Sequence, residues 1–256
     1  MDGRFEKAFS LEGQNAVITG GASGLGFATA KCMVAAGARV VLVGRSTERL
    51  EKACRELGGK ASYYRFDITD TDHAQELANR IIAEKGDVTI LCNNAGNYCK
   101  KPIEDMTVED FKSVLNGHAV GAFAMTRAFA PHMKANKKGS IIFTSSMSGF
   151  MGAPYIIGYS AAKSAFLGMV RTLATEISAG GVRVNAVVPG WIDTPMLGKA
   201  VESDETRKNK ILDRTPMKKF GTPDDIGWAT VFLCTSAAKF VNGISLVVDG
   251  GALIGF

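Results

Sequence analysis

The chain has 256 residues, of which 46% are hydrophobic and 21% are charged, a composition typical of a globular fold with a large core. Its formal charge is only +5, and acidic and basic residues alternate along stretches of helical length, which argues against a nucleic-acid-binding surface. The first segment is polar, which argues against secretion, and no apolar run of 18 residues is present, which argues against a membrane span. The cysteines and histidines are few and scattered, which argues against a disulfide framework and a metal site. We therefore expect a cytoplasmic protein whose partner is a small molecule.

The first half of the chain alternates short β-branched runs with amphipathic stretches of helical length. These runs are almost continuously apolar, which is typical of strands that are buried on both faces of a sheet. The predicted strands are 16–19, 39–43, 62–66 and 88–92, and the predicted helices are 24–36, 48–57 and 73–84.

The second half continues the alternation with one long predicted helix at 108–135, which we expect to loosen near Gly117, Gly121 and Pro131. Alternating strands and helices imply right-handed crossovers between parallel strands. The sequence therefore predicts an α/β fold: a Rossmann-type, doubly wound, seven-stranded parallel sheet flanked by helices, which forms a single domain over 1–256. The remaining predicted strands are 140–144, 182–188 and 244–248, and the remaining helices are 159–179 and 223–234.

The charge-rich segment 190–216 begins with Pro-Gly and is the one long irregular stretch of the sequence. Long connections inside compact domains often cover a binding site. We expect this segment to be a mobile substrate lid with a short helix of its own, and a plain surface insertion is the alternative.

The sequence Thr-Gly-Gly-Ala-Ser-Gly-Leu-Gly at 19–26 lies between the first predicted strand and the first predicted helix. Glycines allow the chain to turn tightly there, and the free N–H groups and dipole of the following helix favour an anion. The turn therefore predicts a site for the pyrophosphate of a dinucleotide. The residues expected to contact it are Gly20, Ser23, Gly24, Leu25 and Gly26.

Tyr159 and Lys163 are four residues apart on a predicted helix, so their side chains share one face. A tyrosine has a free pKa of about 10, and a neighbouring ammonium that lowers it by two or three units contributes roughly 3–4 kcal/mol. Such a phenol exchanges a proton with a carbonyl or hydroxyl group as a hydride moves. Ser146 follows the predicted strand 140–144, at the edge where such sheets bind ligands.

These motifs resemble those of the short-chain dehydrogenase/reductase superfamily, and the resemblance covers nearly the whole chain. It implies an oxidoreductase that uses NAD(P) to interconvert a secondary alcohol and a ketone. The catalytic residues would be Asn116, Ser146, Tyr159 and Lys163. The Ser146 hydroxyl would orient the substrate oxygen, Asn116 would hold a water that links Lys163 to solvent, and Lys163 would also bind the nicotinamide ribose. The resemblance also implies a homotetramer whose interfaces use the helices 108–135 and 159–179 and the last strand.

Further cofactor contacts are implied by the same resemblance. Asp67 would contact the adenine, the Asn-Asn-Ala-Gly motif at 93–96 would support the sheet and the cofactor, and the Pro-Gly segment from 189 would contact the nicotinamide amide and the phosphates. Besides Tyr159 and Lys163, the implied contact residues are Asp67, Ile68, Asn93, Ala95, Gly96, Pro189, Gly190, Ile192 and Thr194.

The end of the predicted strand 39–43 bears on the choice of cofactor. In NAD sites an acidic residue there binds the ribose hydroxyls, whereas this chain has Gly44 followed by Arg45. A guanidinium is a bidentate, permanently charged partner for a phosphate, so we expect NADP(H) to be preferred over NAD(H). Ser23 stands where some NADP-using relatives carry a second basic residue, and a merely solvated Arg45 is the alternative.

Within the family, the closest resemblance is to gluconate 5-dehydrogenases and related sugar-acid or polyol dehydrogenases, carried by 43–45, 146–147, 214–216 and 240–243. A sugar acid needs a cation for its carboxylate, which Lys100, Lys101 or Arg214 would supply. The expected pocket is mostly apolar, which keeps a 3-oxoacyl-(acyl-carrier-protein) reductase, a hydroxysteroid dehydrogenase and a non-catalytic NADP-binding sensor as alternatives. The pocket candidates are Asn97, Tyr98, Met147, Phe150, Met151, Tyr155, Trp191, Met196 and Leu197.

Overall fold

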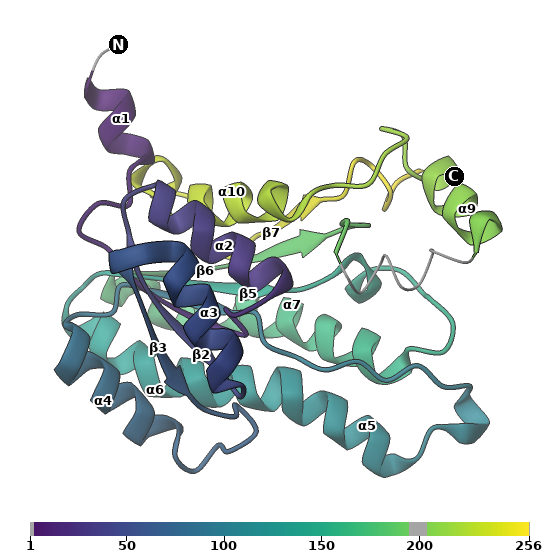
Figure 1. Ribbon diagram of the computed structural model, residues 1–256, viewed down its shortest axis with the longest axis horizontal. Coiled ribbons are helices and arrows are strands. Elements are labelled where there is room, and N and C mark those ends of the chain that lie inside the picture. Colours follow the sequence, from purple (N-terminus) through teal and green to yellow (C-terminus); the bar gives the residue numbers. More distant parts are fainter. Residues whose placement is uncertain (1–2, 195–203, 256) are drawn as a thin grey trace.

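The computed structural model describes residues 3–194 and 204–255, and its strands form one seven-stranded sheet in the order β3-β2-β1-β4-β5-β6-β7 (Figure 1). Every neighbouring pair of strands is parallel, which confirms the predicted doubly wound α/β fold. The strands are β1 (Asn15–Thr19), β2 (Arg39–Gly44), β3 (Ala61–Arg65), β4 (Ile90–Asn93), β5 (Gly139–Thr144), β6 (Val182–Pro189) and β7 (Ser245–Val248).

Helices cover both faces of this sheet (Figure 1). One face packs against α2 (Gly24–Ala35), α3 (Thr47–Leu57) and α10 (Pro223–Cys234). The other packs against α4 (Ala74–Lys85), α6 (Gly121–Ala135) and α7 (Ile157–Ile177), with α5 (Val108–Leu115) beside α7. None of the helices in the described part of the chain is long and apolar enough to span a bilayer.

The core explains why the strands are apolar at nearly every position. Successive side chains of a strand point to opposite faces, so Val17 enters the cluster under α6 and α7 whereas Ile18 enters the cluster under α2 and α10. All five residues of β1 are buried, because its two faces are covered and β2 and β4 flank it.

The predicted long helix at 108–135 is interrupted by a π-helical turn, Asn116–Val120, between α5 and α6. This confirms the loosening expected near Gly117 and Gly121, whereas α6 continues through Pro131. Gly121 is required because a Cβ there would lie 2.8 Å from the Ile68 carbonyl oxygen. π-Turns inside helices are frequent at functional sites, and this one faces the carboxyl edge of the sheet's centre.

Two segments outside the sheet differ from or extend the prediction. A short helix, α1 (Gly3–Phe9), which the polar first segment did not predict, projects from the body (Figure 1) and stacks Phe9 on Phe232. The segment 190–216 contains the expected short helix, α9 (Glu205–Arg214). Residues 195–203 of the expected lid, including Met196 and Leu197, lie outside the described residues.

Candidate active site

The glycine turn joins β1 to α2 with the geometry that an anion site needs. Gly20 and Gly24 adopt the left-handed φ values of +66° and +54°, which other residues rarely adopt. Ser23 precedes the helix without a side-chain cap, so the first N–H groups of α2 keep their hydrogen-bonding capacity. Ser23 and Gly24 are exposed and Gly20 and Leu25 are half-buried, so the turn fits a dinucleotide pyrophosphate.

Gly26 is a packing residue rather than a surface contact. It is buried, and a Cβ on it would lie 2.3 Å from the Gly20 carbonyl oxygen and 2.5 Å from the Asn94 amide nitrogen. The glycine at this position therefore lets α2 approach the turn closely, which shapes the anion site from behind.

The Asn-Asn-Ala-Gly motif ties the end of β4 to the end of β1. The Thr19 hydroxyl accepts from the backbone N–H groups of Asn94 (3.0 Å) and Ala95 (3.1 Å), and the Asn94 side chain donates to the Thr19 carbonyl (3.1 Å). Asn93 is fully buried and donates to Thr126 of α6 (2.9 Å). Its side chain therefore points into the core, and the cofactor contact expected for it is not available to that side chain.

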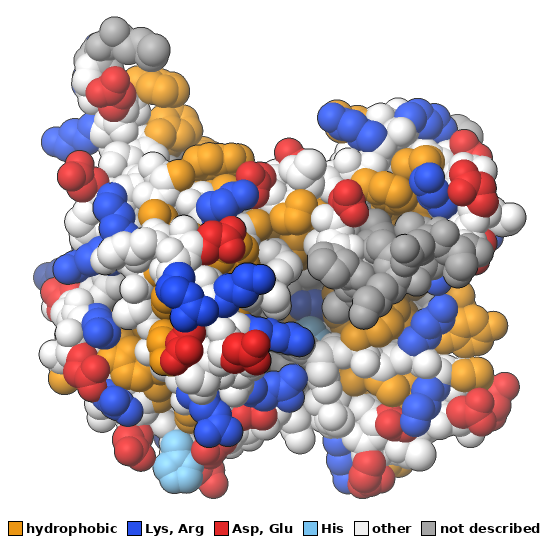
Figure 2. All heavy atoms as spheres, in the orientation of Figure 1, with side chains coloured by type: hydrophobic (Ala, Val, Ile, Leu, Met, Phe, Trp, Pro, Cys, Tyr) orange, Lys and Arg blue, Asp and Glu red, His pale blue; other side chains and the backbone are white. Residues whose placement is uncertain are grey.

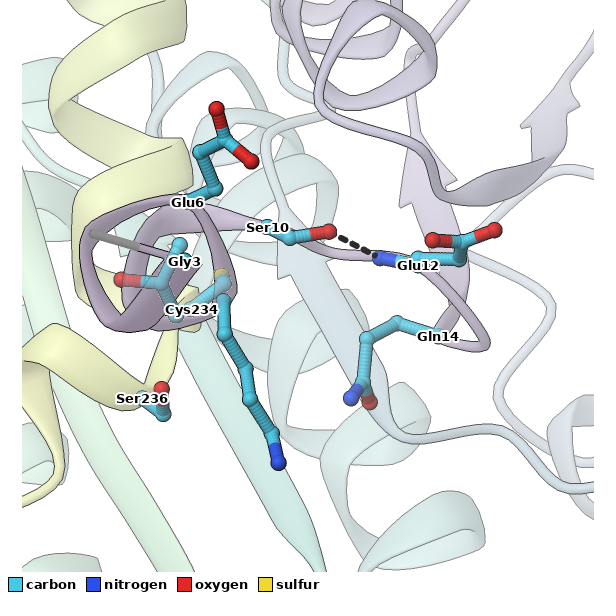
Figure 3. A pocket seen from close by; sticks show the side chains of 9 residues that line it. Gly3, Glu6, Ser10, Glu12, Gln14, Cys234 and Ser236 are labelled. Atoms are coloured by element: carbon cyan, nitrogen blue, oxygen red, sulfur yellow. Dashed lines mark hydrogen bonds between the residues drawn. The ribbon is translucent and has the colours of Figure 1, made fainter. Parts of the chain in front are cut away.

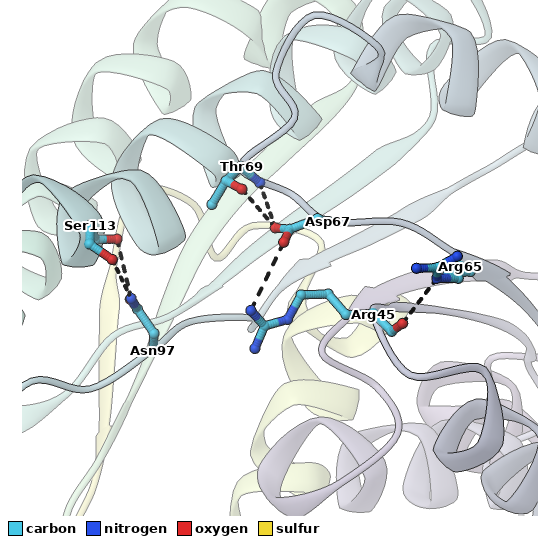
Figure 4. A network of polar contacts seen from close by, with 6 residues as sticks. All are labelled: Arg45, Arg65, Asp67, Thr69, Asn97 and Ser113. Atoms are coloured by element: carbon cyan, nitrogen blue, oxygen red, sulfur yellow. Dashed lines mark hydrogen bonds and ion pairs between the residues drawn. The ribbon is translucent and has the colours of Figure 1, made fainter.

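Arg45 and Asp67 stand together beyond the ends of β2 and β3 (Figure 4). The Arg45 Nη1 lies 3.9 Å from an Asp67 oxygen, and the Asp67 carboxylate also accepts from the Thr69 N–H (3.0 Å) and hydroxyl (2.9 Å). The Arg45 side chain is 76% exposed, so this long ion pair constrains it little and the guanidinium can turn toward a phosphate. The next residue, Ile68, is buried beneath α6 and supports the Arg45–Asp67 pair from below.

Ser146 and Tyr159 meet at the carboxyl end of β5. Ser146 caps a 3₁₀ turn, and its oxygen accepts from the Ser148 N–H (3.2 Å) and hydroxyl (2.8 Å). The Tyr159 hydroxyl, from the first turn of α7, lies beside the Ser146 hydroxyl, which acts to lower the pKa of the phenol. Ser145 instead donates to the Lys163 carbonyl (2.9 Å), so its hydroxyl ties the end of β5 to α7. The predicted serine and tyrosine therefore share one site.

Lys163 lies one helical turn after Tyr159 and is only 3% exposed. Its Nζ donates to the Thr144 carbonyl at the end of β5 (2.6 Å) and lies 5.4 Å from the centre of the Tyr159 ring. The lysine therefore places a cation under the phenol and at the carboxyl edge of the sheet, where a bound nucleotide would lie.

The ionisation of the pair differs from the sequence expectation. Burial lowers the pKa of Lys163 to about 7, because the ammonium loses its hydration. The pKa of Tyr159 is raised, mainly by burial and also by Tyr98, although the hydrogen bond from Ser146 lowers it. Burial of the phenol therefore opposes the low pKa that the spacing of Tyr159 and Lys163 predicted.

Asn116 does not join the cluster. Its side chain is exposed at the start of the π-turn, whereas His118, two residues on, is 3% exposed and packs edge-on against Tyr159 with 5.5 Å between ring centres. Residues two apart in a helix point to nearly opposite sides. His118, rather than Asn116, therefore contacts the Tyr159 ring.

The segment after β6 closes the other side of the site. Pro189 is the last residue of β6, and the Gly190 N–H donates to the Val248 carbonyl (3.0 Å). Ile192 is buried and forms an isolated bridge with Gly221. Thr194 is the last described residue before the gap and is half-buried. These residues flank the same carboxyl edge as Ser146.

Cations and aromatic rings line the mouth of the site. Tyr98 contacts Tyr159 edge-on (5.4 Å between centres), and the Arg207 charge from α9 acts on the Tyr98 phenol, lowering its pKa against the effect of burial. The Lys100 Nζ lies 5.9 Å from the centre of the Tyr155 ring. Figure 2 shows this face hollowed, with lysine and arginine side chains beside the hollow.

Two of the cations expected to hold a substrate carboxylate are already engaged. Lys101 is paired with Asp110 at 2.6 Å, and the Arg214 Nε donates to the Ala252 carbonyl (3.1 Å). Arg207 and Lys100 are therefore better placed than Lys101 or Arg214 to meet an anionic substrate.

A separate pocket lies between α1 and the end of α10 (Figure 3). It holds about 520 Å³ and is lined by Lys7, Ser10, Gln14 and Cys234 among others. Gln14 precedes β1, so this pocket lies at the amino edge of the sheet, opposite the Ser146–Tyr159 site. Its position separates it from the chemistry described above.

Comparison with known proteins agrees with this geometry. A family model described as Enoyl-(Acyl carrier protein) reductase matches residues 20–252. A 2-dehydro-3-deoxy-D-gluconate 5-dehydrogenase of Bacillus subtilis is 34% identical over 98% of this chain and 99% of its own length. A 3-oxoacyl-(acyl-carrier-protein) reductase of Thermotoga maritima is 35% identical over 95% of this chain and 99% of its own.

Among solved structures, a gluconate 5-dehydrogenase of Burkholderia cenocepacia in complex with NADP and tartrate superposes with a TM-score of 0.93. It is 29% identical and the match covers 98% of this chain and 100% of that chain. The similarity extends over the sheet, the glycine turn and the cluster around Tyr159.

Proposed function

The chain belongs to the short-chain dehydrogenase/reductase family, and on that premise we propose that it uses NADP(H) to interconvert a secondary hydroxyl group and a ketone on a sugar acid of the gluconate type. The observation that carries this proposal is that Tyr159 stands beside Ser146 and one helical turn before the buried Lys163, at the carboxyl edge of the sheet that also carries the glycine turn. When bound, the nicotinamide accepts a hydride from the alcohol carbon or returns it to the ketone.

The chain's own residues handle the proton and the orientation. Ser146 holds the substrate oxygen, and the Tyr159 oxygen takes the hydroxyl proton during oxidation or returns it during reduction. The Lys163 ammonium stabilises the phenolate that this transfer requires. The glycine turn, the buried Ile192 and Thr194 bind and orient the nucleotide, with Gly20 and Gly24 leaving room for its phosphates.

A substrate panel tests the proposed reaction. Gluconate, polyols, a 3-oxoacyl thioester and a hydroxysteroid are each supplied with NADP(H) and NAD(H), and the absorbance of the reduced nicotinamide is followed. We expect the highest kcat/KM for a sugar acid. Turnover of only the steroid or only the thioester contradicts the sugar-acid assignment.

Reduction of a 3-oxoacyl thioester is a second candidate. The similarity to the Thermotoga maritima reductase favours it, as do exposed apolar side chains near the mouth such as Phe150. If this candidate is correct, kcat/KM for a 3-oxoacyl thioester exceeds that for gluconate in the panel, and acyl carrier protein binds to the enzyme.

Arg45 is proposed to select NADP(H). We expect Arg45→Ala to lower kcat/KM for NADPH about tenfold and to change that for NADH less than twofold, since one charge-assisted contact to the 2′-phosphate contributes roughly 1.5 kcal/mol. Steady-state kinetics with both cofactors measures this ratio. Arg39→Ala, at the opposite end of β2, is the matched control. An unchanged ratio in Arg45→Ala contradicts the assignment.

Arg207 is proposed to bind the substrate carboxylate. We expect Arg207→Ala to raise KM for gluconate about tenfold, because one charge-assisted hydrogen bond is lost, and to leave KM for a neutral polyol unchanged. Lys208→Ala changes the next residue of α9, which pairs with Glu205, and is the control. If both substrates are affected equally, Arg207 has no role in recognising the carboxylate.

We also propose that the chain forms a homotetramer in the cytoplasm. Exposed apolar side chains lie in one group on α5, the π-turn, α6 and α7, and in a second group on α10 and at or just before β7; all of these elements except α10 are expected at the interfaces. The described cysteines are all free, which suits a reducing compartment. Sedimentation at micromolar concentration tests the assembly: a monomer contradicts it. The first group of side chains is Val108, Val120, Phe123 and Ile157, and the second is Trp228, Ile244 and Val247.

A further inference from the structure

A second arginine lies at the cofactor edge of the sheet and has no role in the proposals above. Arg65 is the last residue of β3 and pairs in register with Gly44 of β2. Its Nε donates to the Arg45 carbonyl (3.3 Å), as Figure 4 shows, and the Phe66 N–H donates to the Gly44 carbonyl (2.8 Å). The ends of β2 and β3 are therefore tied together, with one arginine at each.

The neighbours of Arg65 on β3 show which face of the sheet its side chain occupies. Tyr64 packs into the cluster under α6 and α7, whereas the Tyr63 hydroxyl donates to Glu51 of α3 (3.0 Å). Side chains alternate along a strand, so Arg65 projects toward the same face as Tyr63, the face that α3 covers. Because the carboxyl end of β2 leads into the first turn of α3, Arg45 and Arg65 both lie near the amino end of this helix.

The positive charge of the two arginines is incompletely balanced. Both are exposed, and the only ion pair that either forms with the described residues is the long one between Arg45 and Asp67 (3.9 Å). Figure 4 shows the Arg45 side chain extended toward Asp67 and away from the Arg65 guanidinium, as repulsion between like charges favours. The donors on Nη1 and Nη2 of Arg65 remain available, since its bond to the Arg45 carbonyl uses Nε. An anion is therefore the ligand that this edge favours.

Building on the proposed use of NADP(H), we propose that Arg65 is a second specificity residue, which binds the 2′-phosphate of the cofactor from β3 while Arg45 binds it from β2. The free Nη donors of Arg65 meet the phosphate, and its Nε keeps the backbone of Arg45 in place. Arg45 turns from Asp67 toward the phosphate, which its long, exposed ion pair permits. The phosphate then lies between two cations that otherwise repel each other, so it is bound more tightly than by Arg45 alone.

The test measures nucleotide binding without substrate or turnover. Adenosine 2′,5′-bisphosphate and adenosine 5′-monophosphate, which differ only in the 2′-phosphate, are titrated into the full chain by isothermal titration calorimetry. We expect Arg65→Ala to raise Kd for the bisphosphate about tenfold, because one charge-assisted contact is lost, and to change Kd for the monophosphate less than twofold. Arg55→Ala removes an exposed arginine from the last turn of α3 and is the control, which should change neither Kd.

A second variant separates phosphate binding from support of the backbone. The Nε2 of a glutamine is as many bonds from its Cα as the Nε of an arginine, so Arg65→Gln can still donate to the Arg45 carbonyl but carries no charge. We expect Arg65→Gln to weaken binding of the bisphosphate as much as Arg65→Ala does. If Arg65→Gln binds the bisphosphate as tightly as wild type, or if Arg65→Ala weakens both nucleotides equally, Arg65 only supports the backbone and the proposal is overturned.

The same titrations distinguish failure of this proposal from failure of the proposed function. If wild type binds the two nucleotides equally, the chain does not select NADP(H), and the roles of both Arg45 and Arg65 are wrong. If wild type prefers the bisphosphate and Arg65→Gln keeps that preference in full, only the role of Arg65 is wrong. Neither result involves the substrate, so the sugar-acid assignment is tested separately by the substrate panel.

Discussion

Replacing Tyr159 with phenylalanine is expected to lower kcat/KM by about 1,000- to 10,000-fold, because the variant keeps the ring but loses the group that exchanges the proton. Affinity for NADPH is expected to change less than threefold, since the substitution leaves the glycine turn and the Arg45–Asp67 pair unchanged. Stopped-flow turnover and fluorescence titration of the cofactor measure the two quantities separately.

The control is Tyr63→Phe, which removes another tyrosine hydroxyl with a side-chain partner, Glu51 at 3.0 Å, at the far edge of the sheet. It should retain full activity. If Tyr159→Phe retains more than a tenth of the activity, Tyr159 is not the acid–base group. If neither wild type nor Tyr159→Phe turns over any substrate, a binding protein without catalysis is the better account.

Lys163→Met is expected to abolish turnover and to make the protein more stable. The pKa of the lysine is lowered from 10.5 to about 7 in the folded chain, because burial disfavours the ammonium. Below pH 7 the lysine is protonated in both the folded and the unfolded chain, and the full cost of burying the ammonium lowers the stability of the fold. Between pH 7 and 10 the unfolded state binds more protons, and the wild-type free energy of unfolding gains roughly 1.4 kcal/mol per pH unit from this group. The variant lacks this gain.

The measurement is the free energy of unfolding by urea at pH 6 and pH 9.5. We expect the stability advantage of Lys163→Met over wild type to be about 3 kcal/mol larger at pH 6 than at pH 9.5. Lys52→Met, an exposed lysine of α3, is the control and should show no such dependence on pH. An advantage that is equal at both pH values would mean that the ammonium is not strained by burial.

The sheet was predictable because its strands are recognisable from local sequence alone. Val17 and Ile18 face opposite sides of the sheet, and both sides are buried, so apolar runs appear without any alternation. The glycine turn and the Tyr159–Lys163 pair were also predictable, since each depends on fixed spacing within one or two elements. The short α1 was not predicted, because its seven residues are held by contacts near Phe232 rather than by an apolar stripe of their own.

The catalytic cluster was predicted less completely. The spacing did not show which side chain of the π-turn faces Tyr159: it is His118, whereas Asn116, two residues earlier, is exposed, and the catalytic role of Asn116 stays a prediction. Asn93 was expected to support the sheet and the cofactor, and the structure shows its side chain donating to Thr126 in the core, a contact that depends on how α6 packs. The ionisation of Lys163 and Tyr159 depends on burial by several distant segments, which spacing along one helix does not reveal.

The most direct test of the proposed chemistry follows an isotope from substrate to cofactor. The best alcohol from the substrate panel is deuterated at its carbinol carbon and oxidised by wild-type protein with NADP⁺. The proposed mechanism predicts that the deuterium appears on the nicotinamide ring, and that Tyr159→Phe, although it binds NADP⁺, transfers almost none. Deuterium released to water instead, or transfer by Tyr159→Phe at the wild-type rate, would contradict a hydride transfer assisted by this tyrosine.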